Sequence, residues 1–363
     1  MDNKPPKKHI TPTKSEASNR FLIDAIHLFT GDRSGHMSPY AFTHARYKGD
    51  PVNGIEYWTR FINESKDYYL YDEECDLIKK HAKRIVTHLP DDVSFIELGP
   101  GELSAVREKT IPLLDQFNKT SAKSGLHKQI TEYIALDISS QFAETARQEV
   151  GKRFGIVTSS AVSDFNAERL NISTWAHPVM LVFGGTLFNA PEVKYMKTEY
   201  VLKSYLDNIR DIVGPGGYVV MSQDTNNDKE SLMKAYNHPM SAAAALSIMH
   251  RIERDLETKG FSGNDFEHVA RWTPQKSLLS LDAVSKTDKS FTLGGITCHI
   301  RKGDVFPLVN AFKYSTERFK AIAEDSGFEV VDTMKTGKNG KIALHVLKAK
   351  PASPPFLHRY NGL

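Results

Sequence analysis

An apolar strand that runs directly into a glycine turn constrains this chain more than any other feature. Residues 95–101 read Phe-Ile-Glu-Leu-Gly-Pro-Gly, and an acidic residue, Asp137, closes the next apolar run, Tyr-Ile-Ala-Leu-Asp. In an open α/β sheet, small ligands bind where strands end and helices begin. Glycines such as Gly99 and Gly101 let the backbone approach a ligand, and a carboxylate one strand later can accept both hydroxyls of a ribose. The pattern predicts an α/β sheet with a site for an adenosine-containing cofactor.

Strands and helices alternate through the middle of the chain. Apolar runs predict strands at 93–98, 132–137, 155–158, 179–184 and 217–222, and amphipathic spacing predicts helices at 71–88, 104–118, 139–150 and 197–213. Because single helices separate these strands, we expect a parallel, doubly wound sheet.

The alternation stops after Gln223. Residues 229–259 have the pattern of long helices, and strands are expected at 278–284, 290–301 and 305–314. A helix at 315–326 and strands at 328–334 and 343–348 would then complete the first sheet. The expected fold is a Rossmann-like α/β sheet with an inserted α+β domain. The expected parts are a flexible tail at 1–20, a helical part of the second domain at 21–80, the sheet domain at 81–223, the insertion at 224–314, the completion of the sheet at 315–350 and a tail at 351–363.

Composition excludes several classes of protein. The formal charge of the 363 residues is only +3, too small to suggest nucleic acid or an anionic membrane as the main partner. The two cysteines, Cys75 and Cys298, favour a reducing cytoplasm over a disulfide framework. No apolar run approaches the ~20 residues that a spanning helix needs, and the N-terminus lacks the apolar core of a signal peptide. The histidines are spaced too irregularly for a metal site.

The glycine turn indicates which cofactor to expect. Ser104 stands at the third glycine position of a dinucleotide-binding turn, and the Glu97 carboxylate would repel a phosphate. S-adenosylmethionine (SAM) has no phosphate and carries a sulfonium and an ammonium group. The residues therefore indicate a class I methyltransferase. After the third strand, Asp164 could hold the adenine amino group while Phe165 packs on the base, or Asp164 could simply cap a turn.

Several segments together resemble the histidine-specific, SAM-dependent Nα-methyltransferases of the ergothioneine pathway. They occur in the family's order between about residue 50 and residue 330. They are Glu97-Leu98-Gly99-Pro100-Gly101, Glu108-Lys109-Thr110, Ala135-Leu136-Asp137-Ile138-Ser139, Gly184-Gly185-Thr186-Leu187-Phe188-Asn189, Ala235-Tyr236-Asn237, Phe266-Glu267-His268-Val269-Ala270-Arg271-Trp272 and Phe312-Lys313-Tyr314-Ser315.

The resemblance implies roles for particular residues. The residues implied to hold the cofactor are Gly99, Lys109, Asp137, Asp164 and Phe165, although the spacing from Gly99 to Lys109 is a few residues longer than in the family. Asn189 would bind the carboxylate of the acceptor near Gly184, Tyr236 would add a hydroxyl, and Tyr68 would orient the acceptor amine. Without the resemblance, the preferred interpretation of Asn189 is a helix cap and that of Tyr236 is a half-buried packing residue.

The chain departs from the family where the imidazole of histidine is recognised. The family pattern has Glu and Ser there, whereas this chain has Val309 and Ala311, with Leu281 expected in the same pocket. Leaving the polar groups of an imidazole without partners would cost on the order of 1–3 kcal/mol each. We therefore expect an amino acid, or an amine derived from one, with an apolar or aromatic side chain. Asn310 is expected to offer one polar contact.

Other interpretations stay open at this point. They are a histidine Nα-methyltransferase, a SAM-binding protein without catalysis that acts as an interaction partner and, less well supported, a nicotinamide oxidoreductase. Asp224, after the fifth strand, is expected to be a solvated loop residue rather than a base. The family precedent favours a monomer.

Overall fold

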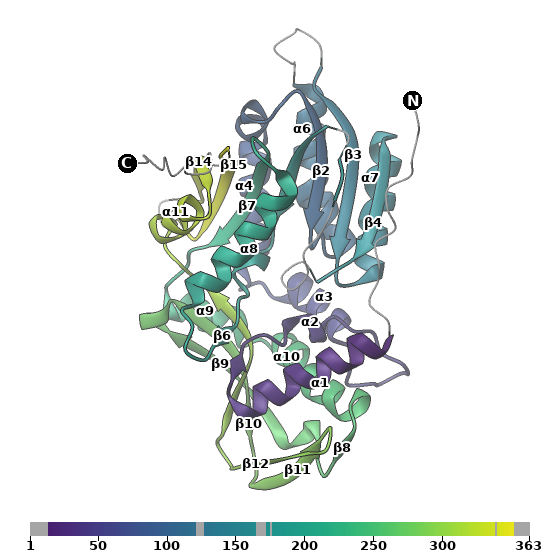
Figure 1. Ribbon diagram of the computed structural model, residues 1–363, viewed down its shortest axis with the longest axis vertical. Helices are drawn as coiled ribbons and strands as arrows, with labels where there is room; N and C mark the ends of the chain where they lie inside the picture. The colour runs from purple at the N-terminus through teal and green to yellow at the C-terminus, as the bar shows by residue number, and fades with distance from the viewer. Residues whose placement is uncertain (1–13, 121–126, 165–171, 175, 338–339, 352–363) are drawn as a thin grey trace, which may run out of the picture.

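The structure is a computed structural model that describes residues 14–120, 127–164, 172–174, 176–337 and 340–351. Figure 1 shows two lobes. The sheet lobe, at the top, contains the large sheet and its covering helices, and the second lobe, at the bottom, contains shorter helices and strands. None of the described helices is long and apolar enough to cross a membrane.

A seven-stranded mixed sheet forms the centre of the sheet lobe, in the order β14-β15-β7-β5-β2-β3-β4. Its strands are β2 (Asp92–Leu98), β3 (Gln129–Asp137), β4 (Val157–Val162), β5 (His177–Val182), β7 (Tyr218–Asp224), β14 (Phe328–Lys335) and β15 (Ile342–Ala349). The strands from β7 to β4 are parallel, as predicted. β15 is antiparallel to both of its neighbours, β7 and β14. Because no crossover helix separates β14 from β15, they can pair only as an antiparallel hairpin.

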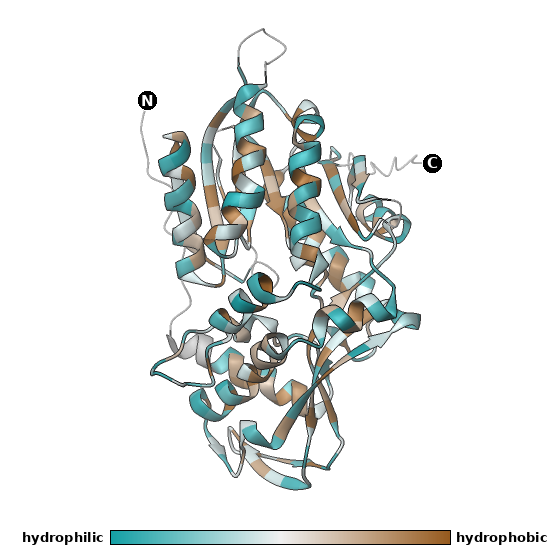
Figure 2. Cartoon of the chain, turned by 180° about the vertical axis from the view of Figure 1, so that it is seen from behind, coloured by the Kyte–Doolittle hydropathy of each residue, from teal (hydrophilic) through white to brown (hydrophobic). Residues whose placement is uncertain are grey.

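Helices cover both faces of this sheet, which confirms the doubly wound fold. They are α4 (Tyr69–His88), α5 (Leu103–Ala105), the π-helical turn η1 (Val106–Thr110), α6 (Ile111–Lys119), α7 (Ser140–Phe154), α8 (Thr198–Val213) and α11 (Thr316–Asp325). Alternate residues of β2 enter two separate cores. Phe95 packs in the core with α4 and α6, and Ile96 in the core with α8 and α11. The outward faces of the helices are hydrophilic, and the strands between them are hydrophobic (Figure 2).

The second lobe combines helices with two small antiparallel sheets, β13-β10-β9 and β12-β11-β8. Its helices are α1 (Lys14–Thr30), α2 (Ser38–Ala41), α3 (Gly54–Glu64), α9 (Lys229–Tyr236) and α10 (Pro239–Asp255), with the 3-10 turns η3 (Gly263–Asp265) and η4 (Pro274–Lys276). Its strands are β8 (Thr258–Lys259), β9 (Phe266–Thr273), β10 (Leu278–Ser285), β11 (Lys289–Leu293), β12 (Ile296–Ile300) and β13 (Val305–Phe312). The short strands β1 (Arg33–Ser34) and β6 (Glu192–Val193) pair with each other, and η2 (Thr186–Phe188) follows β5.

Two local expectations differ from the structure. The single strand predicted at 290–301 is a hairpin, because Gly294 and Gly295 adopt the positive φ angles of 54° and 83° that a tight turn needs. Helix α1 begins at Lys14, so residues 14–20 are helical and not part of a loose tail. The expected domain bounds remain predictions.

Candidate active site

A cavity lies between the carboxyl ends of the parallel strands and the second lobe. It contains about 1490 Å³ of space, part of it open to solvent. Its walls include eleven of the residues predicted from the sequence: Tyr68, Glu97, Gly99, Gly101, Lys109, Asp137, Asp164, Gly184, Asn189, Leu281 and Val309.

The glycine turn after β2 places backbone against the cavity. Gly99 and Gly101 have φ angles of 65° and 71°, which side chains disfavour, and the Gly99 amide donates to the Leu136 carbonyl at 2.7 Å. The Gly101 amide donates to Asp137 Oδ2 at 3.3 Å. The turn and the acidic strand end therefore form one unit.

Asp137 is buried at the end of β3 and faces the cavity. Its Oδ1 accepts a hydrogen bond from the Ser139 amide at 2.8 Å. Burial raises the pKa of this carboxyl to about 6, against the opposing effect of its backbone donors. A carboxylate has about four acceptor positions, so Asp137 can also accept hydroxyl groups of a ligand.

Glu97 is a second buried carboxyl of the cavity wall. Its Oε1 accepts from Thr110 Oγ1 at 2.7 Å and its Oε2 from the Tyr133 hydroxyl at 2.5 Å. Burial raises the pKa of Glu97 to about 7, although both donors favour the ionised form. Each oxygen keeps a free acceptor position, so the side chain can also bind a cationic group.

Lys109 reaches the cavity despite the longer spacing after Gly99. The chain accommodates the extra residues in α5 and the π-helical turn η1, which contains Lys109. The Lys109 ammonium pairs with Glu74 Oε2 at 2.5 Å and lies over the Tyr71 ring. Burial alone would lower the pKa of Lys109, but the charge and hydrogen bond of Glu74, together with the nearby Cys75 and Tyr71, outweigh it and the pKa is raised.

Glu74 is a cavity residue that the sequence analysis missed. It is completely buried on α4, and its Oε1 accepts from the Gly184 amide at 2.7 Å. One carboxylate thus joins Lys109 to the turn after β5. The available signal was its spacing, because Glu74 precedes the apolar residues Leu77 and Ile78 by three and four positions and so shares their buried helix face.

Asp164 lies in the cavity wall with a partner from the second lobe. The Arg20 guanidinium of α1 donates to its Oδ2 at 2.6 Å. Phe165 lies outside the described residues, and the adenine-binding role of this pair stays a prediction.

The opposite wall of the cavity comes from the second lobe. Leu281 of β10 and Val309 of β13 are directly paired across the strands, which places both side chains on the cavity face. The other wall residues of this lobe are Ser38, Pro39, Ala41, Phe42, Trp58, Thr59, Ile62, Ser241, Ala244 and Ala245. None of these wall residues carries a charge. The carboxylates of the wall lie on the cofactor side, on α4 and at or just after the carboxyl ends of strands in the large sheet.

Of the predicted residues that the structure describes, three are not among those that line the cavity. Ala311 pairs with Leu279, two residues along the strand from Val309. Asn310 points to the opposite face of β13, where the Gly35 backbone packs so closely against its amide that a Cβ at position 35 would overlap it. Strand alternation thus separates Asn310 from its neighbour Val309.

Tyr236 is the third predicted residue that does not line the cavity, and its ring packs against that of Tyr68, which does. The two rings meet edge to face at 5.6 Å, and burial raises the pKa of both phenols. The Tyr236 hydroxyl accepts from Lys313 Nζ at 3.3 Å, and Lys313 pairs with Asp224 at 2.5 Å. Asp224 is buried at the end of β7 and also accepts from the Tyr69 hydroxyl at 2.8 Å, so its expected place in a solvated loop is wrong.

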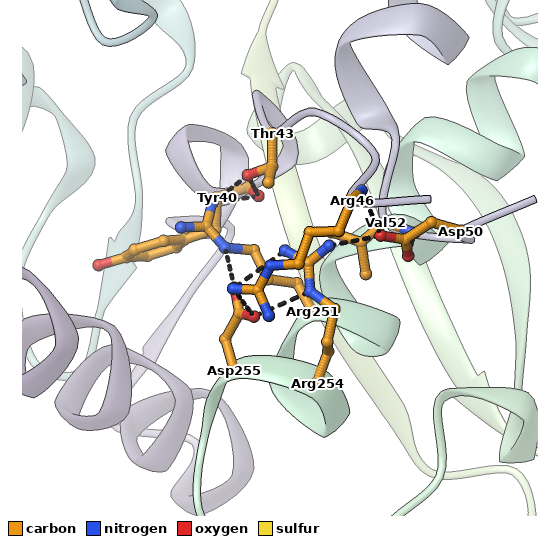
Figure 3. A network of polar contacts seen from close by, with 8 residues as sticks. All are labelled: Tyr40, Thr43, Arg46, Asp50, Val52, Arg251, Arg254 and Asp255. Atoms are coloured by element: carbon orange, nitrogen blue, oxygen red, sulfur yellow. Dashed lines mark hydrogen bonds and ion pairs between the residues drawn. The ribbon is translucent and has the colours of Figure 1, made fainter. Parts of the chain in front are cut away.

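An arginine network fastens the loop that precedes α3 to helix α10 (Figure 3). The Arg251 guanidinium donates to the Tyr40 carbonyl at 2.8 Å and to the Thr43 hydroxyl. Arg254 donates to Asp50 at 2.7 Å. Because this loop follows Ala41 and Phe42, the network fixes part of the acceptor-side wall.

Among the described residues, no group of three or more His, Cys, Asp or Glu side chains could hold a metal ion. A cationic, phosphate-free adenosyl ligand fits the cavity, because a glycine turn and the carboxylates of Glu97 and Asp137 meet there beside one ammonium group, that of Lys109.

Comparison with known proteins agrees with this geometry. The family model described as "Histidine-specific methyltransferase, SAM-dependent" matches residues 50–349. N-methyltransferase fsqC of Aspergillus fumigatus is 23% identical over 75% of this chain and 70% of that protein. N-methyltransferase dtpB of Aspergillus flavus is 21% identical over 74% of each protein.

Histidine N-alpha-methyltransferase of Mycolicibacterium smegmatis is 22% identical over 61% of this chain and 63% of that protein, so the chain spans less than two thirds of this relative. The resemblance seen in the sequence motifs is confirmed, as is SAM as the cofactor. The chain belongs to the histidine-specific, SAM-dependent methyltransferase family.

Proposed function

We propose that this SAM-dependent N-methyltransferase acts on the α-amino group of an amino acid, or an amine derived from one, whose side chain is apolar or aromatic. One observation carries the proposal: the second-lobe wall of the cavity has no charged side chain and is mostly apolar where the acceptor side chain would lie. Leu281 and Val309 face the cavity there as cross-strand neighbours.

The wall favours an apolar side chain over imidazole for two reasons. An imidazole nitrogen against Leu281 and Val309 would lose its hydrogen bonds to water, at about 1–3 kcal/mol per group. An apolar side chain of similar or larger size instead gains about 25 cal/mol for each Å² that it buries. Trp58 and Ile62 of α3 extend the same apolar surface.

The residues of the cavity would divide the work between two ligands. SAM supplies a methyl group on a positively charged sulfur. The glycine turn, Asp137 and Lys109 would hold this cofactor, and the Glu97 carboxylate complements its cationic part. The protein then contributes mainly position and exclusion of water.

On the acceptor side, the Asn189 amide would bind the carboxylate near Gly184, and the Tyr68 hydroxyl would orient the amine. The amine must be neutral to attack. The α-amino group of a free amino acid is protonated at neutral pH, because its own carboxylate stabilises the ammonium, so a proton must leave it before the methyl group is transferred.

The competing proposal is methylation of histidine, which the name of the Mycolicibacterium smegmatis relative favours. Rates of S-adenosylhomocysteine formation with single amino acids separate the two. Our proposal predicts a higher kcat/KM for an aromatic or aliphatic amino acid than for histidine. Histidine as the best acceptor by a wide margin would refute it.

We also propose that the protein acts as a monomer in the cytoplasm and that its partners are small molecules rather than nucleic acids or membranes. The small formal charge of +3 supports this view of its partners. Light scattering coupled to size-exclusion chromatography tests the oligomeric state, and a dimer mass would contradict it.

A further inference from the structure

Ser241 is a buried hydroxyl of the cavity wall that no group of the described residues satisfies. It lies in the first turn of α10, lines the cavity and is only 1% exposed. Within the described part of the chain, its Oγ has no hydrogen-bond partner. A buried polar atom without a partner has lost its hydrogen bonds to water without replacement, so a ligand atom that bonded to it would gain from the contact.

A second serine of the same helix, Ser247, has its hydroxyl satisfied within the protein. Ser247 is equally buried, and its Oγ donates to the Ala244 carbonyl at 2.7 Å. Such bonds to the preceding turn are the usual way in which a helical serine is satisfied. Ser247 is not among the residues that line the cavity, whereas the unpartnered Ser241 is.

The surroundings of Ser241 define the shape of the subsite. Ala244 and Ala245 follow at the third and fourth positions, so the three residues share one helix face. The small alanine side chains leave room beside α10. Helix α3, which packs against α10, adds Trp58 and Ile62 to the cavity wall. Figure 1 shows both helices in the second lobe beneath the large sheet.

We propose that Ser241 determines specificity, and that the acceptor carries an aromatic ring with one hydrogen-bonding group on its rim, such as a phenol O–H or an indole N–H. This inference rests on the proposed function. The ring would occupy the apolar space beside Ala244 and Trp58, and its single polar group would bond to the Ser241 hydroxyl. Imidazole fits poorly because it has two polar ring nitrogens, and one Ser241 hydroxyl can satisfy only one of them.

The test compares acceptors that differ in this single group. Tyrosine is paired with phenylalanine, and tryptophan with 3-(1-naphthyl)alanine, with the wild type, Ser241→Ala and the matched control Ser247→Ala. The wild type should prefer the polar member of at least one pair by about tenfold or more in kcat/KM. Ser241→Ala should abolish that preference by slowing the polar member alone, and Ser247→Ala should preserve it.

A stability measurement shows that the variants fold. Ser241→Ala removes an unpartnered hydroxyl and should keep or raise Tm, whereas Ser247→Ala loses a hydrogen bond and should lower Tm slightly. An equal loss on both members of a pair, or an unchanged preference in Ser241→Ala, would overturn the inference.

The substrate panel distinguishes the two proposals. A best acceptor with an aliphatic side chain would overturn the role of Ser241 and leave the proposed function standing. Histidine as the best acceptor, or binding of SAM without turnover of any amino acid or derived amine, would overturn both.

Discussion

Replacing Glu74 by glutamine tests how the cofactor side of the cavity is held together. The substitution keeps an oxygen that can accept from the Gly184 amide but removes the negative charge that faces Lys109. Both side chains are buried, at 0% and 9% exposure. Breaking such a pair from one side leaves an uncompensated buried charge, and the expected cost is about 3–5 kcal/mol of unfolding free energy.

The expected cost is specific to burial, and the chain offers a matched control. Glu108 pairs with Lys79 on the surface, where the two side chains are 49% and 43% exposed. Glu108→Gln should therefore cost no more than about 1 kcal/mol. Urea denaturation of both variants gives the comparison, provided that the slope of unfolding free energy against urea concentration (the m value) is the same as in the wild type.

A double variant then isolates the pair itself. In Glu74→Gln/Lys109→Met the ammonium is gone, so the unfolding free energy should recover relative to Glu74→Gln alone. The loss of unfolding free energy in the double variant should differ from the sum of the two single-variant losses by more than about 1 kcal/mol, the size of coupling seen for contacting residues. Additive losses, or equal losses in Glu74→Gln and Glu108→Gln, would refute the reasoning.

Three further outcomes follow from the site. The pKa of Asp137 is raised to about 6, and hydroxyl donors prefer its ionised form, so S-adenosylhomocysteine should bind more weakly as pH falls through 6. Calorimetry on the Asp137→Asn variant should show that this part of the pH dependence is lost. An affinity that varies with pH in the same way in both proteins would contradict the assignment. Val309→Glu places a carboxylate opposite Leu281 and should lower kcat/KM for apolar acceptors by about tenfold or more, with histidine turnover rising relative to them; an unchanged ranking would count against the assigned wall. Arg251→Lys weakens the bonds to Tyr40 of α2 and to Thr43 of the loop that follows, and should raise the acceptor KM while leaving the SAM KM unchanged. Equal effects on both KM values would indicate general destabilisation.

Much of the cofactor side could be predicted from sequence because its rules are local. A strand end, a glycine turn and an acid at the next strand end meet at one edge of any parallel sheet. Gly99, Gly101 and Asp137 needed no knowledge of distant contacts, and they lie together as expected. Lys109 was harder, because the longer spacing after Gly99 is taken up by a π-helical turn that no sequence pattern announced.

The missed features are tertiary. Glu74 reaches the site only because helix α4, which carries it, packs against the large sheet beside the cavity. Arg20 contacts Asp164 across 144 residues of sequence. Asn310 was expected in the pocket because it is next to Val309, but neighbours in a strand face opposite sides. Deciding which of the two faces the cavity required the pairing of β13 with β10.

The central claim is that the acceptor wall selects an apolar or aromatic side chain. Its most direct test is a competition in which purified enzyme and SAM are incubated with an equimolar mixture of the twenty amino acids, and mass spectrometry identifies the methylated products. The account predicts that an N-methylated aromatic or aliphatic amino acid forms first and that histidine is left largely unmodified. Methylated histidine as the dominant product would contradict it.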